Sequence, residues 1–110
     1  IIYIQQFMDK SHILFYSKKA KYVIFKISAT WCEPCKYVAP YIKKCHLSTE
    51  QRIQQSIPCI EIDYDEDRAA VRFLRVQKVP TLIMYINGEM QHVTMGSSWQ
   101  NIEEFYNRIR

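Results

Sequence analysis

The sequence predicts an α/β fold, a mixed five-stranded sheet with helices on both faces, in one domain that covers residues 1–110. Segments rich in β-branched and aromatic residues alternate with helix-like segments, which is typical of parallel strands joined by crossover helices. The last two strand-like segments are separated only by Asn87-Gly88, the strongest short signal for an antiparallel hairpin. No repeat, low-complexity segment or flexible linker divides the chain, so we expect a single domain.

The first part of the chain contributes two strands and two helices. Residues 1–4 predict a short strand, and residues 9–17 predict a helix. The run KYVIFKIS at residues 21–28 is interrupted only by lysines, which indicates a strand buried on both faces. A helix predicted over residues 34–46 begins with proline, which the first turn tolerates. Pro40 should bend this helix, because it removes one backbone hydrogen bond.

The third strand and third helix follow. In PCIEIDYD, residues 58–65, the apolar Ile60 and Ile62 alternate with polar residues, which predicts a strand. Residues 65–75 predict a helix with acidic residues at its N-terminal end, where the helix dipole favours them.

A hairpin and a final helix complete the fold. Residues 81–86 and 89–95 flank Asn87-Gly88 and predict the two antiparallel strands. In the final helix Ser97 can form a capping box with Gln100. Its apolar face consists of Ile102, Phe105, Tyr106 and Ile109.

Composition argues against several classes of function. Fifteen Lys and Arg against eleven Asp and Glu give a net charge of +4, but the basic residues are spread along the chain, so we expect no nucleic-acid partner. No stretch approaches the roughly 18 consecutive apolar residues of a membrane span, so no membrane partner is expected. Two of the four cysteines lie in one CxxC motif and the other two stand alone. This spacing does not indicate a set of structural disulfides. A reducing, cytoplasmic location is therefore the expectation.

The segment TWCEPCK at residues 30–36 carries the reactive chemistry. It lies at the carboxyl end of the second predicted strand, where open α/β sheets place their sites. Cys32 and Cys35 are close enough on one helical turn to form a disulfide. Cys32 would sit at the helix N-terminus, where free amide protons and the helix dipole stabilise a thiolate, and Cys35 would be further in and less exposed. We therefore expect Cys32 to attack a substrate disulfide and Cys35 to resolve the mixed disulfide.

The order of motifs resembles the thioredoxin family over almost the whole chain. Residues 31–36 match the WCxPCK signature, and Ala39-Pro40 match the proline that bends the following helix. Val79-Pro80-Thr81 match the loop with the family's cis-proline, and Asn87-Gly88 and Gly96 follow at the family's spacing. Each match alone is modest, but together and in order they are highly specific.

The resemblance implies a substrate-binding groove around the cysteines. Pro80 would be cis and would pack against the disulfide, and Val79 and Gly96 would flank the groove in which a substrate peptide lies. A proline has no competing N–H, and a glycine lets another backbone approach closely. Trp31 would face the substrate beside Cys32, with the alternative that it only fills the core.

The resemblance also implies the thioredoxin fold and a dithiol–disulfide oxidoreductase that reduces protein disulfides through Cys32 and Cys35. It implies neither an organic cofactor nor a metal, but an external reductase or thiol donor. We expect a monomer. Two alternatives stay open: a thiol oxidase or isomerase of an oxidising compartment, which differs in redox potential, and a binding module with dispensable cysteines.

The sequence departs from the family pattern at four positions. Glu33 replaces the usual glycine between the cysteines and puts a negative charge beside the reactive thiol. Arg75 replaces a helix-ending glycine, so the turn that follows can differ in shape. Lys26 lies six residues before Cys32, where thioredoxins commonly carry a buried aspartate thought to move a proton for the second cysteine. Glu61 falls where the family's lysine pairs with that aspartate.

Lys26 and Glu61 therefore resemble a pair with exchanged charges. Because a lone charge in a buried strand is costly, we hypothesise that they form an ion pair on adjacent strands beneath Cys35. Glu61 would accept the proton when Cys35 attacks. Two alternatives remain: a register two residues different would place Cys59 opposite Lys26, or Lys26 would simply extend to solvent.

The remaining cysteines and histidines receive no functional role. Cys45 and His46 could add ligands to a zinc or iron–sulfur site at the CxxC motif, but adjacent helical residues point about 100° apart, a poor geometry for a tetrahedral site. No metal site is therefore predicted. Cys45 and Cys59 are interpreted as small apolar residues, with a regulatory disulfide as the alternative.

Overall fold

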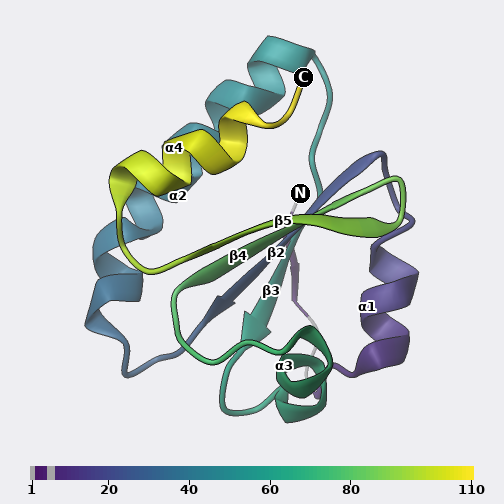
Figure 1. The fold of residues 1–110 in the computed structure, drawn as a ribbon, viewed down its shortest axis with the longest axis vertical. Coiled ribbons are helices and arrows are strands. Elements are labelled where there is room, and N and C mark those ends of the chain that lie inside the picture. Colours follow the sequence, from purple (N-terminus) through teal and green to yellow (C-terminus); the bar gives the residue numbers. More distant parts are fainter. Residues whose placement is uncertain (1, 5–6) are drawn as a thin grey trace.

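The computed structural model describes residues 2–4 and 7–110, so the first residue of the strand predicted at 1–4 lies outside it. Strands and helices alternate along the described chain until the final hairpin (Figure 1). The elements are β1 (Ile2–Ile4), α1 (Lys10–Tyr16), β2 (Tyr22–Ser28), α2 (Glu33–Ile53), β3 (Cys59–Asp63), α3 (Arg68–Leu74), β4 (Thr81–Ile86), β5 (Glu89–Met95) and α4 (Trp99–Asn107).

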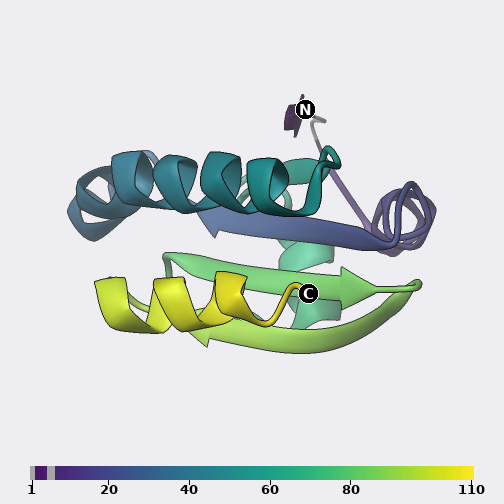
Figure 2. The same ribbon diagram turned by 90° about the horizontal axis from the view of Figure 1, so that it is seen from above.

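The described strands form one mixed sheet in the order β1-β3-β2-β4-β5. The strand β3 pairs in parallel with β1 and β2, whereas β4 pairs antiparallel with β2 and β5. The helices α2 and α4 pack side by side on one face, and α1 and α3 lie on the other (Figures 1 and 2). The predicted mixed sheet with helices on both faces is confirmed. None of the described helices combines the length and apolar character that crossing a lipid bilayer requires.

The central strand β2 supplies side chains to an apolar core on each face, because alternate residues of a strand point to opposite sides. On the face of α1 and α3, the core includes Val23, Phe25, Ile27, Ile13, Val71 and Leu74. On the face of α2 and α4, it includes Tyr22, Ile24, Val38, Ile42, Phe105 and Tyr106. The prediction that this strand is buried on both faces is confirmed.

The helix α2 is longer than the sequence predicts. It runs through Pro40, passes the predicted end at residue 46 and continues to Ile53. No glycine or proline stops it there, and Thr49 is buried and Ile53 is packed against the core, so the last turns are held by tertiary contacts. The helix ends where Gln54 adopts a left-handed conformation with φ 55°.

The helix α3 begins later than predicted, at Arg68, and no acidic residue lies in its first turn. Asp67 precedes the helix, but its carboxylate accepts hydrogen bonds from the backbone N–H groups of Met8 at 2.7 Å and Asp63 at 2.8 Å. Asp67 therefore ties the start of α3 to Met8 and to the end of β3, and the predicted acidic residues lie before the helix rather than in its first turn. At the other end, Arg75 has φ 58°, the left-handed conformation that glycine most readily adopts.

The cap of α4 also differs from the prediction by one residue. Ser98, not Ser97, precedes the helix, and its side chain accepts the Asn101 N–H at 3.2 Å. The predicted capping box between Ser97 and Gln100 is therefore wrong. The predicted apolar face is correct, since Ile102, Phe105, Tyr106 and Ile109 are all buried.

Candidate active site

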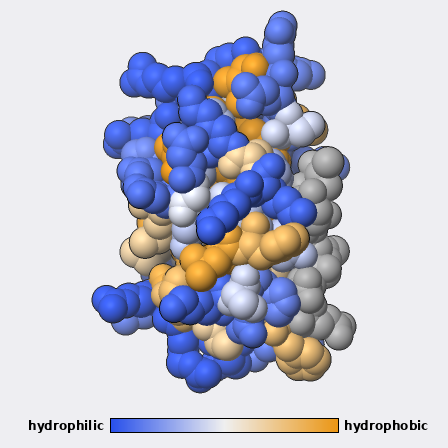
Figure 3. All heavy atoms as spheres, turned by 90° about the vertical axis from the view of Figure 1, so that its right-hand side faces the viewer, coloured by the Kyte–Doolittle hydropathy of each residue, from blue (hydrophilic) through white to orange (hydrophobic). Residues whose placement is uncertain are grey.

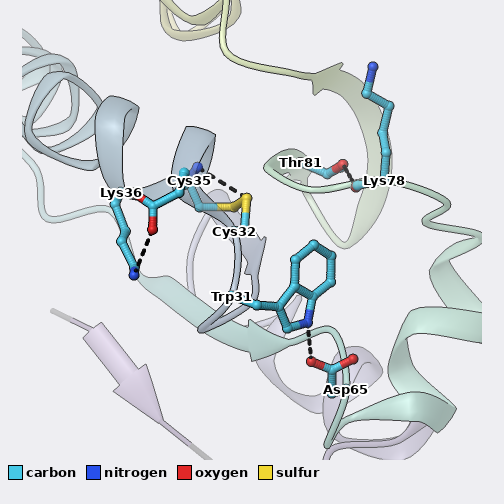
Figure 4. The surroundings of a disulfide bond; sticks show 8 residues. Trp31, Cys32, Cys35, Lys36, Asp65, Lys78 and Thr81 are labelled. Carbon is cyan, nitrogen blue, oxygen red and sulfur yellow. Dashed lines mark hydrogen bonds and ion pairs between the residues drawn. A yellow bond between two sulfur atoms is a disulfide. The ribbon is translucent and has the colours of Figure 1, made fainter.

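Cys32 and Cys35 form a disulfide at the N-terminus of α2, with their Cα atoms 5.3 Å apart (Figure 4). Cys32 is the residue that precedes the first turn, as predicted, and its Sγ accepts the Cys35 N–H at 3.1 Å. An amide donor and the positive end of a helix dipole both favour negative charge at this sulfur. The site can therefore stabilise a Cys32 thiolate when the disulfide is reduced.

The exposure of the two cysteines does not differ as predicted. Cys32 is 3 % exposed and Cys35 is 5 % exposed, so Cys35 is not the more buried residue. Ala29 belongs to the same apolar cluster, and Tyr64 and Val79 pack against it. The prediction failed because it considered only the helix and not the segments that cover it. The inequality of the two thiols rests on their positions in α2, not on exposure.

Trp31 lies beside the disulfide with 61 % of its surface exposed. Its indole Nε1–H donates to Oδ2 of Asp65 at 2.6 Å (Figure 4), and its ring meets that of Tyr64 edge to face. Trp31 is therefore not core filler but an exposed aromatic side chain in a fixed orientation. Sequence reasoning missed Asp65, although its position just after β3 at the same edge of the sheet was a usable signal.

The segments before β4 and after β5 meet close to the cysteines. The Val79–Pro80 peptide bond is cis, and Val79 packs against the cluster that contains both cysteines. The Gly96 N–H donates to the Pro80 carbonyl at 2.8 Å, and Gly96 has φ +93°, which favours glycine. Thr81 Oγ1 donates to the carbonyl of Lys78 at 2.7 Å and holds the start of β4 (Figure 4). The residues that the sequence assigns to a substrate groove therefore lie together.

The negative charge of Glu33 has a partner. The Lys36 ammonium lies 3.2 Å from its carboxylate, and the Glu33 side chain is 82 % exposed. An exposed pair of this kind stabilises the fold by at most about 1 kcal/mol. Its relevance here is local, because Lys36 and water together offset the charge that Glu33 adds beside Cys32.

Lys26 and Glu61 lie directly opposite each other on β2 and β3, with Nζ and Oε1 3.7 Å apart. Cys59 lies opposite Ile24, so the alternative register is wrong, and Lys26 does not simply extend to solvent, since its ammonium lies beside Glu61. The pair is only partly buried, with 17 % and 28 % of the two side chains exposed.

A groove of about 790 Å³ lies under α2, and both charged side chains of this pair line it. The described lining also includes Lys36, Pro40 and Cys59, but not Cys35. The structure thus brings Lys26 and Glu61 together without showing them in contact with the second cysteine.

His46, to which the sequence assigned nothing, joins α2 to its neighbours. Its ring lies 2.9 Å from the Ile57 carbonyl through Nε2 and 3.0 Å from the Tyr106 hydroxyl through Nδ1. A carbonyl only accepts, so Nε2 carries the proton, and Nδ1 of the neutral ring accepts from Tyr106. Burial lowers the pKa of His46. The ring therefore has a structural role, for which the sequence offered no signal.

The other two cysteines are free thiols. Burial raises the pKa of Cys59 to about 12 and also raises that of Cys45, so both favour the unreactive protonated form. Both ring nitrogens of His46 are engaged, and the described residues contain no cluster of three or more side chains suited to hold a metal ion. Nothing in the described part of the chain supports the zinc or iron–sulfur alternative.

Comparison with known proteins points to one family. The model of the family described as thioredoxin matches residues 4–108. A thioredoxin from Mycolicibacterium smegmatis is 35 % identical over 69 residues, which cover 63 % of this chain and 60 % of that protein. A thioredoxin from Ophiophagus hannah is 32 % identical over 85 residues, 77 % of this chain and 76 % of that protein.

A solved structure shows the same fold over the full length. The oxidised thioredoxin from Plasmodium falciparum superposes with a TM-score of 0.78 and 21 % identity, covering 98 % of this chain and 97 % of that one. In that protein, as here, the form described is the oxidised one.

Proposed function

The chain belongs to the thioredoxin family and is a dithiol–disulfide oxidoreductase, and we propose that it reduces protein disulfides by attack of Cys32 and resolution by Cys35. One observation carries this assignment of roles: the Cys35 N–H donates to Sγ of Cys32 at the N-terminus of α2. The thiolate is the attacking species, and this environment favours it at Cys32.

The reaction proceeds in two exchanges. The Cys32 thiolate attacks one sulfur of the substrate disulfide, so a mixed disulfide forms and the first substrate thiolate leaves and takes up a proton. Cys35 then loses its proton and attacks Sγ of Cys32, which forms the intramolecular disulfide and releases the second substrate thiolate. The dithiol gives up two electrons and two protons, and the substrate disulfide takes them up as two thiols.

Glu61 is our proposed acceptor for the Cys35 proton, with Lys26 holding its carboxylate in place. The support is their 3.7 Å contact on neighbouring strands under α2. Because the groove lining described here does not include Cys35, the proton would move through water. Trp31, Val79, Pro80 and Gly96 are the proposed contacts for the substrate segment.

Members of the family act on disulfide substrates and receive electrons from a reductase partner. For this chain we propose an external reductase or thiol donor, a monomeric state and a reducing compartment such as the cytoplasm. The free thiols of Cys45 and Cys59 support a reducing compartment.

A trapping experiment tests the roles of the two cysteines. The Cys35→Ser variant should accumulate a mixed disulfide with an oxidised protein substrate through Cys32, because the resolving thiol is missing. The matched Cys32→Ser variant should accumulate none. Mass spectrometry of the trapped species identifies the cysteine involved. The reverse pattern, in which Cys32→Ser accumulates a mixed disulfide through Cys35 and Cys35→Ser accumulates none, would overturn the assignment.

A redox titration separates the reductase from the oxidase alternative. A reduction potential of about −270 mV for the Cys32/Cys35 pair fits a reductase, whereas a value of about −120 mV fits an oxidase of an oxidising compartment. If Cys32→Ser instead preserves the protein's full cellular function, the chain is a binding module.

A further inference from the structure

Three aromatic side chains of α2 and α4 form a stack that begins two residues after Cys35. We propose that this aromatic stack, made of Tyr37, Tyr41 and Trp99, is a second contact surface for oxidised protein substrates and gives them preference over small disulfides. The inference rests on the proposed reduction of protein disulfides and adds residues outside the groove of Trp31 and Pro80.

The stack is held rigidly between α2 and α4. The Trp99 ring lies parallel to that of Tyr41, with centroids 4.7 Å apart and an angle of 8° between the planes. The Tyr37 ring stacks on Trp99 at 5.8 Å and 23°. The Tyr41 hydroxyl donates to Oε2 of Glu103 on α4 at 2.8 Å, which fixes one tyrosine in place.

The stack is nevertheless open to solvent. Tyr37 is 66 % exposed and Trp99 is 48 % exposed, although each makes a ring contact. Rigid exposed aromatic side chains bind partners well, because they offer large apolar area and lose little rotamer freedom on binding. The partner side chains that fit such a surface are apolar or aromatic residues that flank the substrate disulfide.

The stack is close in sequence to two segments of the site, the start of α2 and the segment that follows Gly96. Along α2, Pro34, Tyr37 and Tyr41 are spaced by three and four residues and so share one helix face. At 1.5 Å per residue, Tyr37 lies about 8 Å and Tyr41 about 14 Å beyond Cys32 along the helix. On the other side, Trp99 follows three residues after Gly96, and the start of α4 lies beside the first half of α2 (Figures 1 and 2).

A protein substrate that reacts at Cys32 must also cover the surface around it. A substrate sulfur must contact Sγ of Cys32, a residue that is only 3 % exposed, whereas Trp31 before it and Tyr37 on α2 are 61 % and 66 % exposed. A typical partner covers about 800 Å² on each protein, equivalent to a disc of roughly 16 Å radius. A protein docked at Cys32 therefore also covers the aromatic stack, whereas a small disulfide reaches the sulfur without touching it.

The test compares insulin, reduced with dithiothreitol as electron donor, with a small disulfide, reduced by the prereduced protein after dithiothreitol has been removed. No reductase is involved in either assay. In Trp99→Ala and in Tyr37→Ala, kcat/KM for insulin reduction should fall about fivefold to tenfold, mainly through KM. The rate at which the prereduced protein, without dithiothreitol, reduces 5,5′-dithiobis(2-nitrobenzoate) should stay within twofold. Trp99→Phe keeps a stacking ring and should restore most of the insulin activity.

Phe15→Ala is the matched control. Phe15 is 59 % exposed, similar to Tyr37, but lies on α1 on the side of the molecule shown in Figure 3, away from α2 and α4. This variant should reduce both substrates like the wild type. Thermal unfolding, followed by circular dichroism, shows whether each variant is folded at the assay temperature. If Trp99→Ala is unfolded there, the result with Tyr37→Ala alone decides the test.

Several outcomes overturn the inference. Unchanged insulin kinetics in Tyr37→Ala and Trp99→Ala would do so, as would equal losses with both substrates or an equal loss in Phe15→Ala. A loss that appears only when a reductase supplies the electrons would assign the stack to that partner instead. A wild-type protein that reduces neither substrate would refute the proposed function itself, which distinguishes the two failures.

Discussion

Replacing Glu61 with glutamine removes one charge of the Lys26–Glu61 pair and keeps the shape of the side chain. At 3.7 Å and an effective dielectric constant near 20, the direct attraction is about 4.5 kcal/mol before desolvation is subtracted. The side chains are 17 % and 28 % exposed, so water can hydrate Lys26 once its partner is gone. We therefore expect Glu61→Gln to lower the free energy of unfolding by about 1 kcal/mol, not by the roughly 3–5 kcal/mol of a fully buried pair.

The same substitution should slow the second thiol exchange. If Glu61 accepts the proton of Cys35, its loss should lower the rate of mixed-disulfide release at pH 7 by about tenfold or more. This factor lies below the usual range for a direct general base, because we propose that the proton moves through water rather than directly. The difference should shrink above about pH 8.5, where a cysteine ionises without help.

Rapid mixing with an oxidised substrate, followed by acid quench at successive times, measures the decay of the mixed disulfide. Urea unfolding measures the stability. Glu89→Gln, an exposed glutamate at the start of β5, is the matched control and should change neither quantity. An unaltered release rate in Glu61→Gln across neutral pH, or an equal slowing in Glu89→Gln, would refute the role of Glu61. A loss of more than about 3 kcal/mol in the free energy of unfolding would refute the argument that water hydrates Lys26 after the substitution.

Three further predictions concern stability, and urea unfolding checks each of them. Burial lowers the pKa of His46, so the unfolded chain takes up a proton that the native chain does not as the pH falls below about 6.5. The free energy of unfolding should therefore fall below that pH and be flat above it, and His46→Gln should lose this component; an unchanged pH profile in the variant would contradict the reasoning. Asp67→Ala removes the acceptor of two backbone N–H groups and should cost about 2–4 kcal/mol, so a loss under 1 kcal/mol would show that water replaces the carboxylate. Arg75→Gly relieves a left-handed residue with φ 58° and should stabilise the protein by about 1 kcal/mol, whereas destabilisation would show that the arginine side chain contributes more than the backbone costs.

The sequence predicts those features that depend on local patterns. Apolar periodicity, the Asn87-Gly88 turn and the CxxC motif at a strand end are each readable within a few residues. They suffice for the element order, the mixed sheet and the position of Cys32 before α2. The opposed positions of Lys26 and Glu61 were expected from the resemblance to the thioredoxin family, which left a register two residues different open, and the pairing of β2 with β3 decides between the two.

Features that depend on partners distant in sequence could not be predicted. Asp67 lies 59 residues from Met8, whose N–H it accepts, so nothing near it in sequence shows why α3 starts at Arg68, three residues later than predicted. The bond between Trp31 and Asp65 spans 34 residues. The equal burial of the two cysteines depends on Val79, which arrives from a third segment. Local propensity leaves such details open, and tertiary contacts decide them.

The order of strands in the sheet has a consequence for how the chain reaches its fold. Lys26 of the central strand β2 pairs with Glu61 on one side and with Leu82 on the other, so both of its neighbours are 35 or more residues away in sequence. The hairpin of β4 and β5 is local by comparison, since Ile86 pairs with Glu89. Closing long loops is entropically costly before their contacts form, so we expect folding to be limited by the docking of β2 between β3 and the hairpin. Substitutions in β2 should then slow folding, whereas substitutions in outer elements should mainly speed unfolding.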